Sequence, residues 1–245
     1  TGADPLVNVG DIDLDIATVS NIMSGDGGIY LGSVRDLRLE TVTSTGEMEL
    51  LIAAGDLTLA GQQSVLRALI EIEAGALNQL DGTTLEATGA TGAGRVTVTA
   101  TNDISVSRIT ANNGDMSLVT TRGDIIDNSS VNGAGNENLV VTNGKLTELS
   151  ADAIGNRFEN GSLDVATTAV GDITASSGNT FISFTGVTDS LVTIDNVSAT
   201  ARDADVGLIS GQGGLSITSL NVARELTVEV AGSADAPAIL LGNTT

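Results

Sequence analysis

The chain has 245 residues, of which 41% are hydrophobic, and this is enough to bury a sizeable core, which excludes a disordered polypeptide. It has no Cys and no His, which excludes disulfides, thiolate or imidazole metal sites, and catalytic systems built on either residue. With 10 basic and 31 acidic residues the net charge is −21, so nucleic acid is not an expected partner.

A Gly-Asp-apolar motif recurs along the chain. Its copies are Gly10-Asp11-Ile12, Gly55-Asp56-Leu57, Gly114-Asp115-Met116, Gly123-Asp124-Ile125 and Gly171-Asp172-Ile173. Equivalent strand-like positions recur about every 20 residues, as from Leu37 to Leu57 and from Val96 to Met116. A period of this length is typical of an architecture in which each unit packs only on its neighbours.

Within each repeat, apolar and polar residues alternate, which is the pattern of a half-buried strand. In Val96-Thr97-Val98-Thr99 the valines are expected to face inward and the threonines outward. Gly, Asn and Asp turns, such as Asn113-Gly114 and Asn143-Gly144, separate the runs. The sequence predicts an all-β chain: a right-handed parallel β-helix, or β-solenoid, with coils of about 20 residues and two or three short strands per coil. About twelve coils would make a rod of roughly 58 Å.

The segment 65–74 also fits an amphipathic helix by composition. We predict a strand, because Ala68, Ile70 and Ile72 alternate with Leu69 and the glutamates between them. Residues 148–161 break the period, and we expect a loop leaving the rod there, serving either as a functional loop or as a spacer. We treat residues 1–245 as a single solenoid domain that forms part of a longer chain, since both ends of the rod are expected to need a continuation.

The runs Leu69 to Gly89 and Arg95 to Ile104 resemble the repeats of filamentous-haemagglutinin-type adhesins. Members of that family are bacterial surface or secreted proteins with a right-handed β-helical shaft. The general repeat pattern of that family extends over Gly10 to Val230. The resemblance implies an extracellular or cell-surface location and a role in adhesion.

Arg122, Gly123 and Asp124 spell the integrin-recognition tripeptide, which makes them the candidate receptor-binding residues. Since Gly123-Asp124-Ile125 is already a copy of the repeat motif, the tripeptide has a purely structural explanation as well. No catalytic, cofactor-binding or metal-ligating residue is assigned.

The repeated Asp residues have two explanations. Stacked carboxylates about 4.8 Å apart repel one another, which calcium would relieve. Asp also caps turns by accepting hydrogen bonds from nearby backbone N–H groups, without any ion. Calcium is therefore the one cofactor considered, and none is required.

The sequence favours a non-enzymatic adhesive shaft whose partners are a host or neighbouring-cell receptor or glycan, or copies of itself. No apolar run approaches the ~18 residues of a membrane-spanning helix, so this segment is not expected to insert into a membrane. One alternative is a filament or surface-layer subunit that stacks head to tail. The other is a β-helix polysaccharide lyase or hydrolase, for which sugar-stacking aromatics are scarce: Tyr30 and three Phe.

Overall fold

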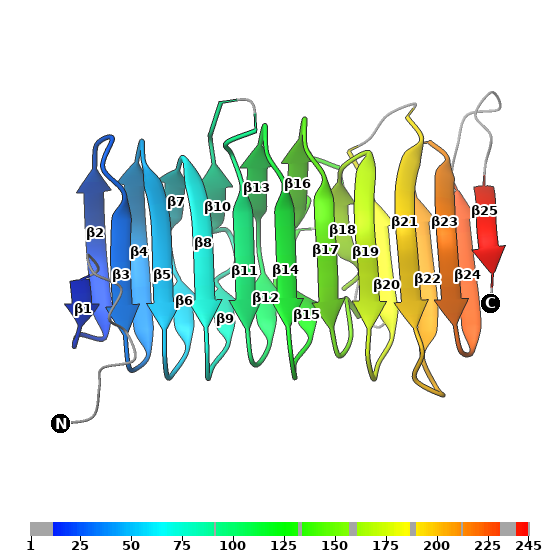
Figure 1. The fold of residues 1–245 in the computed structure, drawn as a ribbon, viewed down its shortest axis with the longest axis horizontal. Coiled ribbons are helices and arrows are strands. Elements are labelled where there is room, and N and C mark those ends of the chain that lie inside the picture. The colour runs from blue at the N-terminus through cyan, green and yellow to red at the C-terminus, as the bar shows by residue number, and fades with distance from the viewer. Residues whose placement is uncertain are drawn as a thin grey trace.

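The computed structural model describes residues 12–90, 92–131, 134–156, 161–186, 190–211, 213–230 and 239–244. These residues contain no helix, and they form a β-solenoid of about ten turns of roughly 22 residues each (Figure 1). The predicted fold class is confirmed. The coils are fewer and longer than the twelve of about 20 residues that the spacing predicted, because several turns are extended, as between Asp127 and Leu139.

The first of two parallel sheets has 11 strands, which follow one another in chain order along the rod. These strands are β1 (Ile12–Leu14), β3 (Ile29–Ser33), β5 (Glu47–Ile52), β8 (Arg67–Ile72), β11 (Val96–Ala100), β14 (Met116–Thr120), β17 (Leu146–Ala151), β19 (Ala169–Ala175), β21 (Val192–Ala199), β23 (Leu215–Val222) and β25 (Ile239–Thr244). At about 4.8 Å per strand the sheet is roughly 48 Å long.

The second sheet has 14 strands and supplies the other walls of each coil. They are β2 (Thr18–Ser24), β4 (Leu37–Ser44), β6 (Leu57–Leu59), β7 (Gln62–Val65), β9 (Leu77–Gln79), β10 (Thr84–Ala87), β12 (Ile104–Val106), β13 (Ile109–Asn112), β15 (Ile125–Asp127), β16 (Leu139–Thr142), β18 (Leu163–Ala166), β20 (Thr180–Phe184), β22 (Asp205–Ser210) and β24 (Glu225–Val230).

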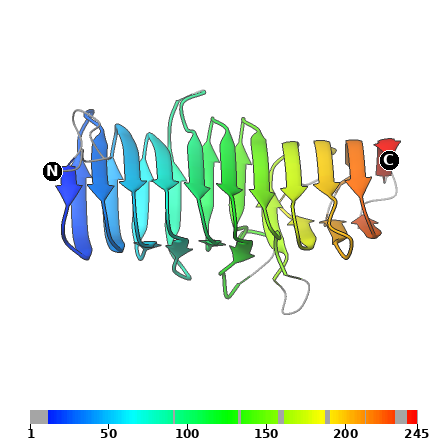
Figure 2. The ribbon, with the colours of Figure 1, turned by 60° about the horizontal axis from the view of Figure 1, so that its bottom comes forward.

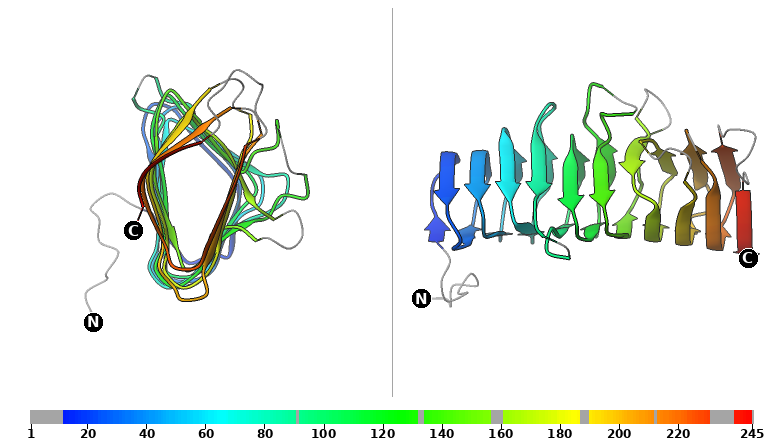
Figure 3. Two further views of the ribbon diagram at one scale, coloured as in Figure 1. Left: turned by 90° about the vertical axis from the view of Figure 1, so that its right-hand side faces the viewer. Right: turned by 90° about the horizontal axis from the view of Figure 1, so that it is seen from above.

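The long strand β4 pairs with β6 through its first half and with β7 through its second half. The middle coils consequently have three short strands, whereas the coils toward either end have two longer ones. Viewed along the rod the coils superpose on a three-cornered outline (Figure 3), and a turned view shows them stacked in a single row (Figure 2).

The core consists of columns of apolar side chains, one from each coil. Met48, Ala68, Val96 and Met116 follow one another through direct strand pairing, and all are buried. Each column is continuous because the pairing is in register, so an inward residue packs on its equivalents above and below. The predicted inward positions Val96 and Val98 are buried; Leu226, near the end of the rod, is half-buried.

The tight turns depend on residues that tolerate a left-handed backbone. Asn113 and Asn143 have φ of 57° and 53°, and the Asn143 Nδ2 donates to the Asn113 Oδ1 at 2.9 Å. Asn is one of the few non-glycine residues that accept this conformation at low cost. The Asn-Gly motifs predicted turns at these positions, and the structure shows that the two turns also stack as the strands do.

Residues 67–72 form strand β8, which confirms the strand prediction for the segment 65–74. Ile70 is buried, and its neighbour Leu69 is 42% exposed. The expected loop at residues 148–161 begins later than predicted, because Glu148 lies inside β17 and Ile154 bridges to the strands on both sides. The part of that range at residues 157–160 lies outside the described residues.

One irregularity runs through the second half of the first sheet. Met116 and Ser117 of β14 pair with Leu146 and Glu148 of β17, so Thr147 is an extra residue. Every later strand of this sheet keeps one extra residue at the same place, which together form the bulge column: Thr147, Gly171, Asp195, Thr218 and Gly242. A β-bulge that begins at β17 is thus propagated to β25.

Candidate functional site

Aspartates line one corner of the rod, immediately before the strands of the second sheet. The Asp36 Oδ1 accepts the backbone N–H of Asp56, the equivalent residue one coil later, at 2.9 Å. The same bond, also at 2.9 Å, joins Asp56 to Ala76, Asp103 to Asp124, and Asp124 to Ala153. We call Asp36, Asp56, Asp103 and Asp124 the Asp ladder.

The ladder continues with an amide, since the Asn179 Oδ1 accepts the N–H of Asp205 at 2.8 Å. The sequence led us to expect Asp to accept from nearby N–H groups of its own turn, but these donors lie 20 to 29 residues away in the next coil. Directly before strand β14 of the first sheet, Asp115 accepts from the N–H of Lys145 in the same manner at 3.0 Å. Aspartate therefore fastens consecutive coils together.

Two of the repeated aspartates do not belong to this arrangement. Asp172 lies within β19 and is exposed, and Asp11 lies outside the described residues. Among the residues that the structure describes, no group of three or more carboxylates gathers as a metal site would require. No described residue belongs to a helix that could span a membrane.

The structure places the candidate receptor-binding residues directly before β15. The Arg122 side chain is exposed, and its backbone N–H donates to the Thr101 carbonyl at 2.9 Å. Gly123 is buried, and a Cβ there would lie 2.4 Å from the Asp103 backbone nitrogen. Asp124 is half-buried and belongs to the Asp ladder. The tripeptide thus follows the path of a coil, and Arg122 is the exposed residue of the three.

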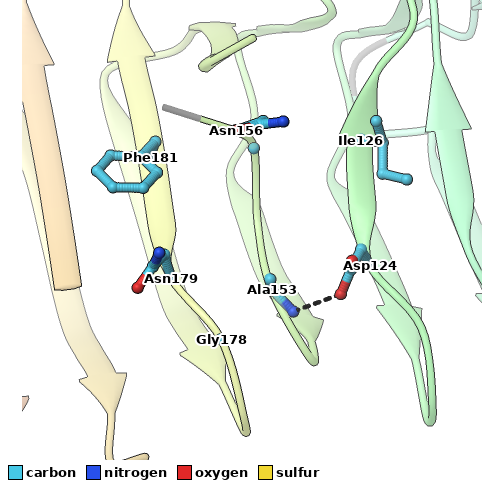
Figure 4. A pocket seen from close by; sticks show the side chains of 8 residues that line it. Asp124, Ile126, Ala153, Asn156, Gly178, Asn179 and Phe181 are labelled. Carbon is cyan, nitrogen blue, oxygen red and sulfur yellow. Dashed lines mark hydrogen bonds between the residues drawn. The ribbon is translucent and has the colours of Figure 1, made fainter. Parts of the chain in front are cut away.

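A cavity of about 330 Å³ opens beside Asp124 (Figure 4). Eight described residues from three consecutive coils line it: Asp124, Ile126, Ala153, Gly155, Asn156, Gly178, Asn179 and Phe181. We call it the Asp124 cavity. It lies where the sequence predicted a departure from the rod, at residues 148–161.

The Asp124 cavity exists because the middle coil places a glycine, without a side chain, at the position between the two flanking strands. Ile154 makes single bridges to Ile125 and Thr180 in place of a full strand, so the next residue, Gly155, lies between Ile126 and Phe181. Gly155 has φ of +66°, and a Cβ there would lie 2.2 Å from the Phe181 carbonyl oxygen. A side chain is excluded at this position, and the backbone forms the floor.

Burial raises the pKa of Asp124 above its ordinary value. The N–H of Ala153 opposes this by donating to the carboxylate, while the negative charges of Asp103 and Asp152 raise the pKa further. Within the cavity, Asp124 and Asn179 lie toward one end and Asn156 toward the other (Figure 4). The site thus combines one carboxylate and two amides with the side chains of Ile126 and Phe181.

Sequence reasoning singled out Asp124 but missed Ile126, Asn156, Asn179 and Phe181 as its neighbours. Their alignment depends on coil lengths that vary in this region, and no fixed period places them together. Comparisons of the chain with protein-family models, with curated proteins and with solved structures gave no match.

Proposed function

We propose that this chain is a structural and adhesive shaft of a large bacterial protein exported to the cell surface, and that it is not an enzyme. The observation that supports the proposal is the unbroken ladder of parallel coils, from β1 to β25, with outward positions rich in Ser, Thr and Asn. A ladder of this kind forms a stiff extended surface. Export and adhesion rest on the resemblance of its repeats to those of filamentous-haemagglutinin-type adhesins.

Binding is proposed over cleavage because of the composition of the Asp124 cavity. Glycoside hydrolysis ordinarily needs two carboxyl groups flanking the scissile bond. Asp124 is the one carboxylate among the described residues that line the cavity. Release of reducing ends from a polysaccharide panel by the purified chain would contradict the proposal.

Adhesion is tested with beads that carry the intact chain, counted on cultured epithelial cells and on bacterial layers. The matched control is the variant Ile70→Asp, which places a charge in the core and unfolds the coil. Folded chain is expected to retain beads that the control does not. Equal retention by both would contradict an adhesive role.

A separate variant tests the tripeptide Arg122-Gly123-Asp124 in the same bead-adhesion assay. Arg122→Ala alters an exposed side chain and leaves the buried Gly123 and the Asp124 hydrogen bond in place. Loss of adhesion with this variant would support receptor binding through Arg122, Gly123 and Asp124. Unchanged adhesion would assign these residues to the coil alone.

A head-to-tail filament is the second candidate, favoured by the apolar strand at one end of the rod. Ile239, Leu240 and Leu241 of β25 are 40%, 49% and 48% exposed. Exposed apolar side chains that lie together are typical of surfaces that contact another chain. Negative-stain microscopy over a concentration series, with and without calcium, distinguishes filaments from discrete rods.

A further inference from the structure

We propose that the Asp124 cavity is a binding subsite for one unit of a neutral glycan. The inference deepens the proposed adhesive function, on which it rests, by naming a site and a ligand class. Three properties of the cavity support the proposal: its shape, its polar groups and its charge.

The shape of the cavity suits a single ring. Ile126 and Phe181 stand on either side of Gly155, two coil spacings apart, or roughly 9.6 Å between their strands. The Phe181 ring lies beside Gly207, where a Cβ would approach its Cδ1 to 2.6 Å, so this glycine is what accommodates the ring. Ligand sites range from about 300 to 1,000 Å³, so a cavity of about 330 Å³ fits a small ligand.

The polar groups match a ligand with many hydroxyls. A hydroxyl both donates and accepts hydrogen bonds, so its site needs both functions. The Asp124 carboxylate bonds the Ala153 N–H through Oδ1, and a carboxylate has about four lone-pair positions in all. The amide of Asn179 accepts from Asp205 through Oδ1 and has N–H groups to donate. Apolar walls beside such groups are suited to the C–H faces and hydroxyl edge of a sugar.

The charge of the cavity selects against acidic sugars. None of the described residues that line it is basic, and Asp103 and Asp152 add negative charge close to Asp124. A uronic acid or a sulfated sugar would be repelled by these carboxylates. The neutral hexoses and N-acetylhexosamines remain as the ligand class.

The test is an NMR titration of the isotope-labelled 245-residue chain. The probes are the methyl glycosides of glucose, galactose, mannose and N-acetylglucosamine, with glucuronic and galacturonic acids as charged counterparts. At least one neutral glycoside is expected to shift the backbone amides of Ala153, Gly155 and Gly178 saturably, with a millimolar Kd, and the acids to bind more weakly.

Two variants and one control locate the ligand. Asp124→Asn keeps an acceptor for the Ala153 N–H but removes the charge, and Phe181→Leu keeps an apolar side chain but removes the ring. Each is expected to weaken binding by about tenfold. Asp56→Asn is the matched control, because Asp56 accepts from Ala76 with the same 2.9 Å geometry and does not line the cavity; it should leave the affinity unchanged.

The proposal is overturned if no neutral glycoside shifts these amides, if the uronic acids bind as tightly, or if Asp56→Asn weakens binding as much as Asp124→Asn. These outcomes are separable from failure of the adhesive function. Beads that adhere although the cavity binds no sugar would place adhesion on another surface. Sugar binding without bead adhesion would retain the subsite and remove the adhesive role.

Discussion

Lys145, the residue directly before β17, reaches across the neighbouring strand to form an ion pair with Asp195 of β21, with its Nζ 2.5 Å from the Asp195 Oδ2. The strand between them is β19, and its bulge-column residue is Gly171. A Cβ on Gly171 would lie 3.3 Å from the Lys145 Cε and 2.2 Å from the Thr147 carbonyl oxygen. Glycine at this position thus lets the lysine pass and lets the strands approach.

Replacing Gly171 with alanine is expected to destabilise the rod. The added methyl group has no room against Thr147, and overpacking of this kind costs about 1–3 kcal/mol. Urea denaturation of Gly171→Ala measures the loss. Gly25→Ala serves as the control, since a Cβ there meets nothing within 4 Å. Equal stability of the two variants would refute the packing explanation.

The ion pair itself is expected to contribute little. Both side chains are substantially exposed, at 39% for Lys145 and 61% for Asp195, so solvent screens their attraction. Lys145→Met keeps most of the aliphatic stem and should lower the free energy of unfolding by about 1 kcal/mol or less. The difference should shrink further in 1 M salt, and a loss that is insensitive to salt would point to packing of the stem.

The register of β8 predicts opposite outcomes for two adjacent residues. Ile70 is fully buried, and Ile70→Ala should cost about 2–5 kcal/mol through lost burial and a residual cavity. Leu69 is 42% exposed on the outer face, and Leu69→Ala should cost about 0.5 kcal/mol or less. Thermal and urea unfolding of both variants provide the comparison. Similar losses would mean that the strand faces are assigned wrongly.

Asp124 predicts a specific dependence of stability on pH. Because its pKa is raised in the fold, the ionised carboxylate is less favourable in the folded than in the unfolded chain. This cost is absent below the unfolded pKa of about 3.9, develops as the pH rises, and is complete above the folded pKa. Asp124→Asn removes it, and the variant should be more stable than the parent at pH 7.

The measurement is the free energy of unfolding of parent and Asp124→Asn from pH 3 to pH 8. The advantage of the variant should disappear as the pH falls through the unfolded pKa. A difference that stays constant over this range would mean that ionisation of Asp124 does not contribute. Asp124→Ala adds a second comparison, since it removes the acceptor of the Ala153 N–H and should cost about 1 kcal/mol.

The solenoid could be predicted from the sequence because the residue pattern that specifies each strand lies within a short segment of the chain. Alternation within β8 identifies the buried face, and the spacing from Val96 to Met116 gives the period, which the direct pairing of these two residues confirms. Each coil repeats the same alternation of apolar and polar residues, so the pattern becomes easier to recognise as more coils are compared.

The bulge column was missed, although it has a sequence signal. Inward residues normally alternate with a spacing of two, but a spacing of three separates Leu146 from Leu149, and Val170 from Ile173. The same spacing recurs in β21 and β23. A single spacing of three resembles an irregularity of one strand. Its recurrence in successive strands of the sheet is what identifies a shared bulge.

The Asp124 cavity could not be predicted, because its position depends on long-range alignment. Asp124 meets Ala153 after 29 residues, whereas Asp103 meets Asp124 after 21. The pairing of Ile154 with Ile125 and Thr180 sets which side chains are neighbours. That pairing follows from the packing of whole coils, which the local pattern does not encode.

The extra residue of the bulge column first appears in β17 and is present in every later strand of the first sheet. Because every strand of the first sheet from β17 to β25 carries the extra residue, its loss from β19 alone would shift the pairing of β19 with β17 and β21 by one residue beyond that point. Within the strands, a change in length preserves the pairing only when a complete coil is added or removed, whereas the turns between strands already differ in length. Excision of residues 96–115, one whole coil, would bring Met116 onto Ala68 in the same register that Val96 now occupies. A molecule of this kind can be shortened or lengthened as a stack, while remaining intolerant of a single inserted or deleted residue within a strand.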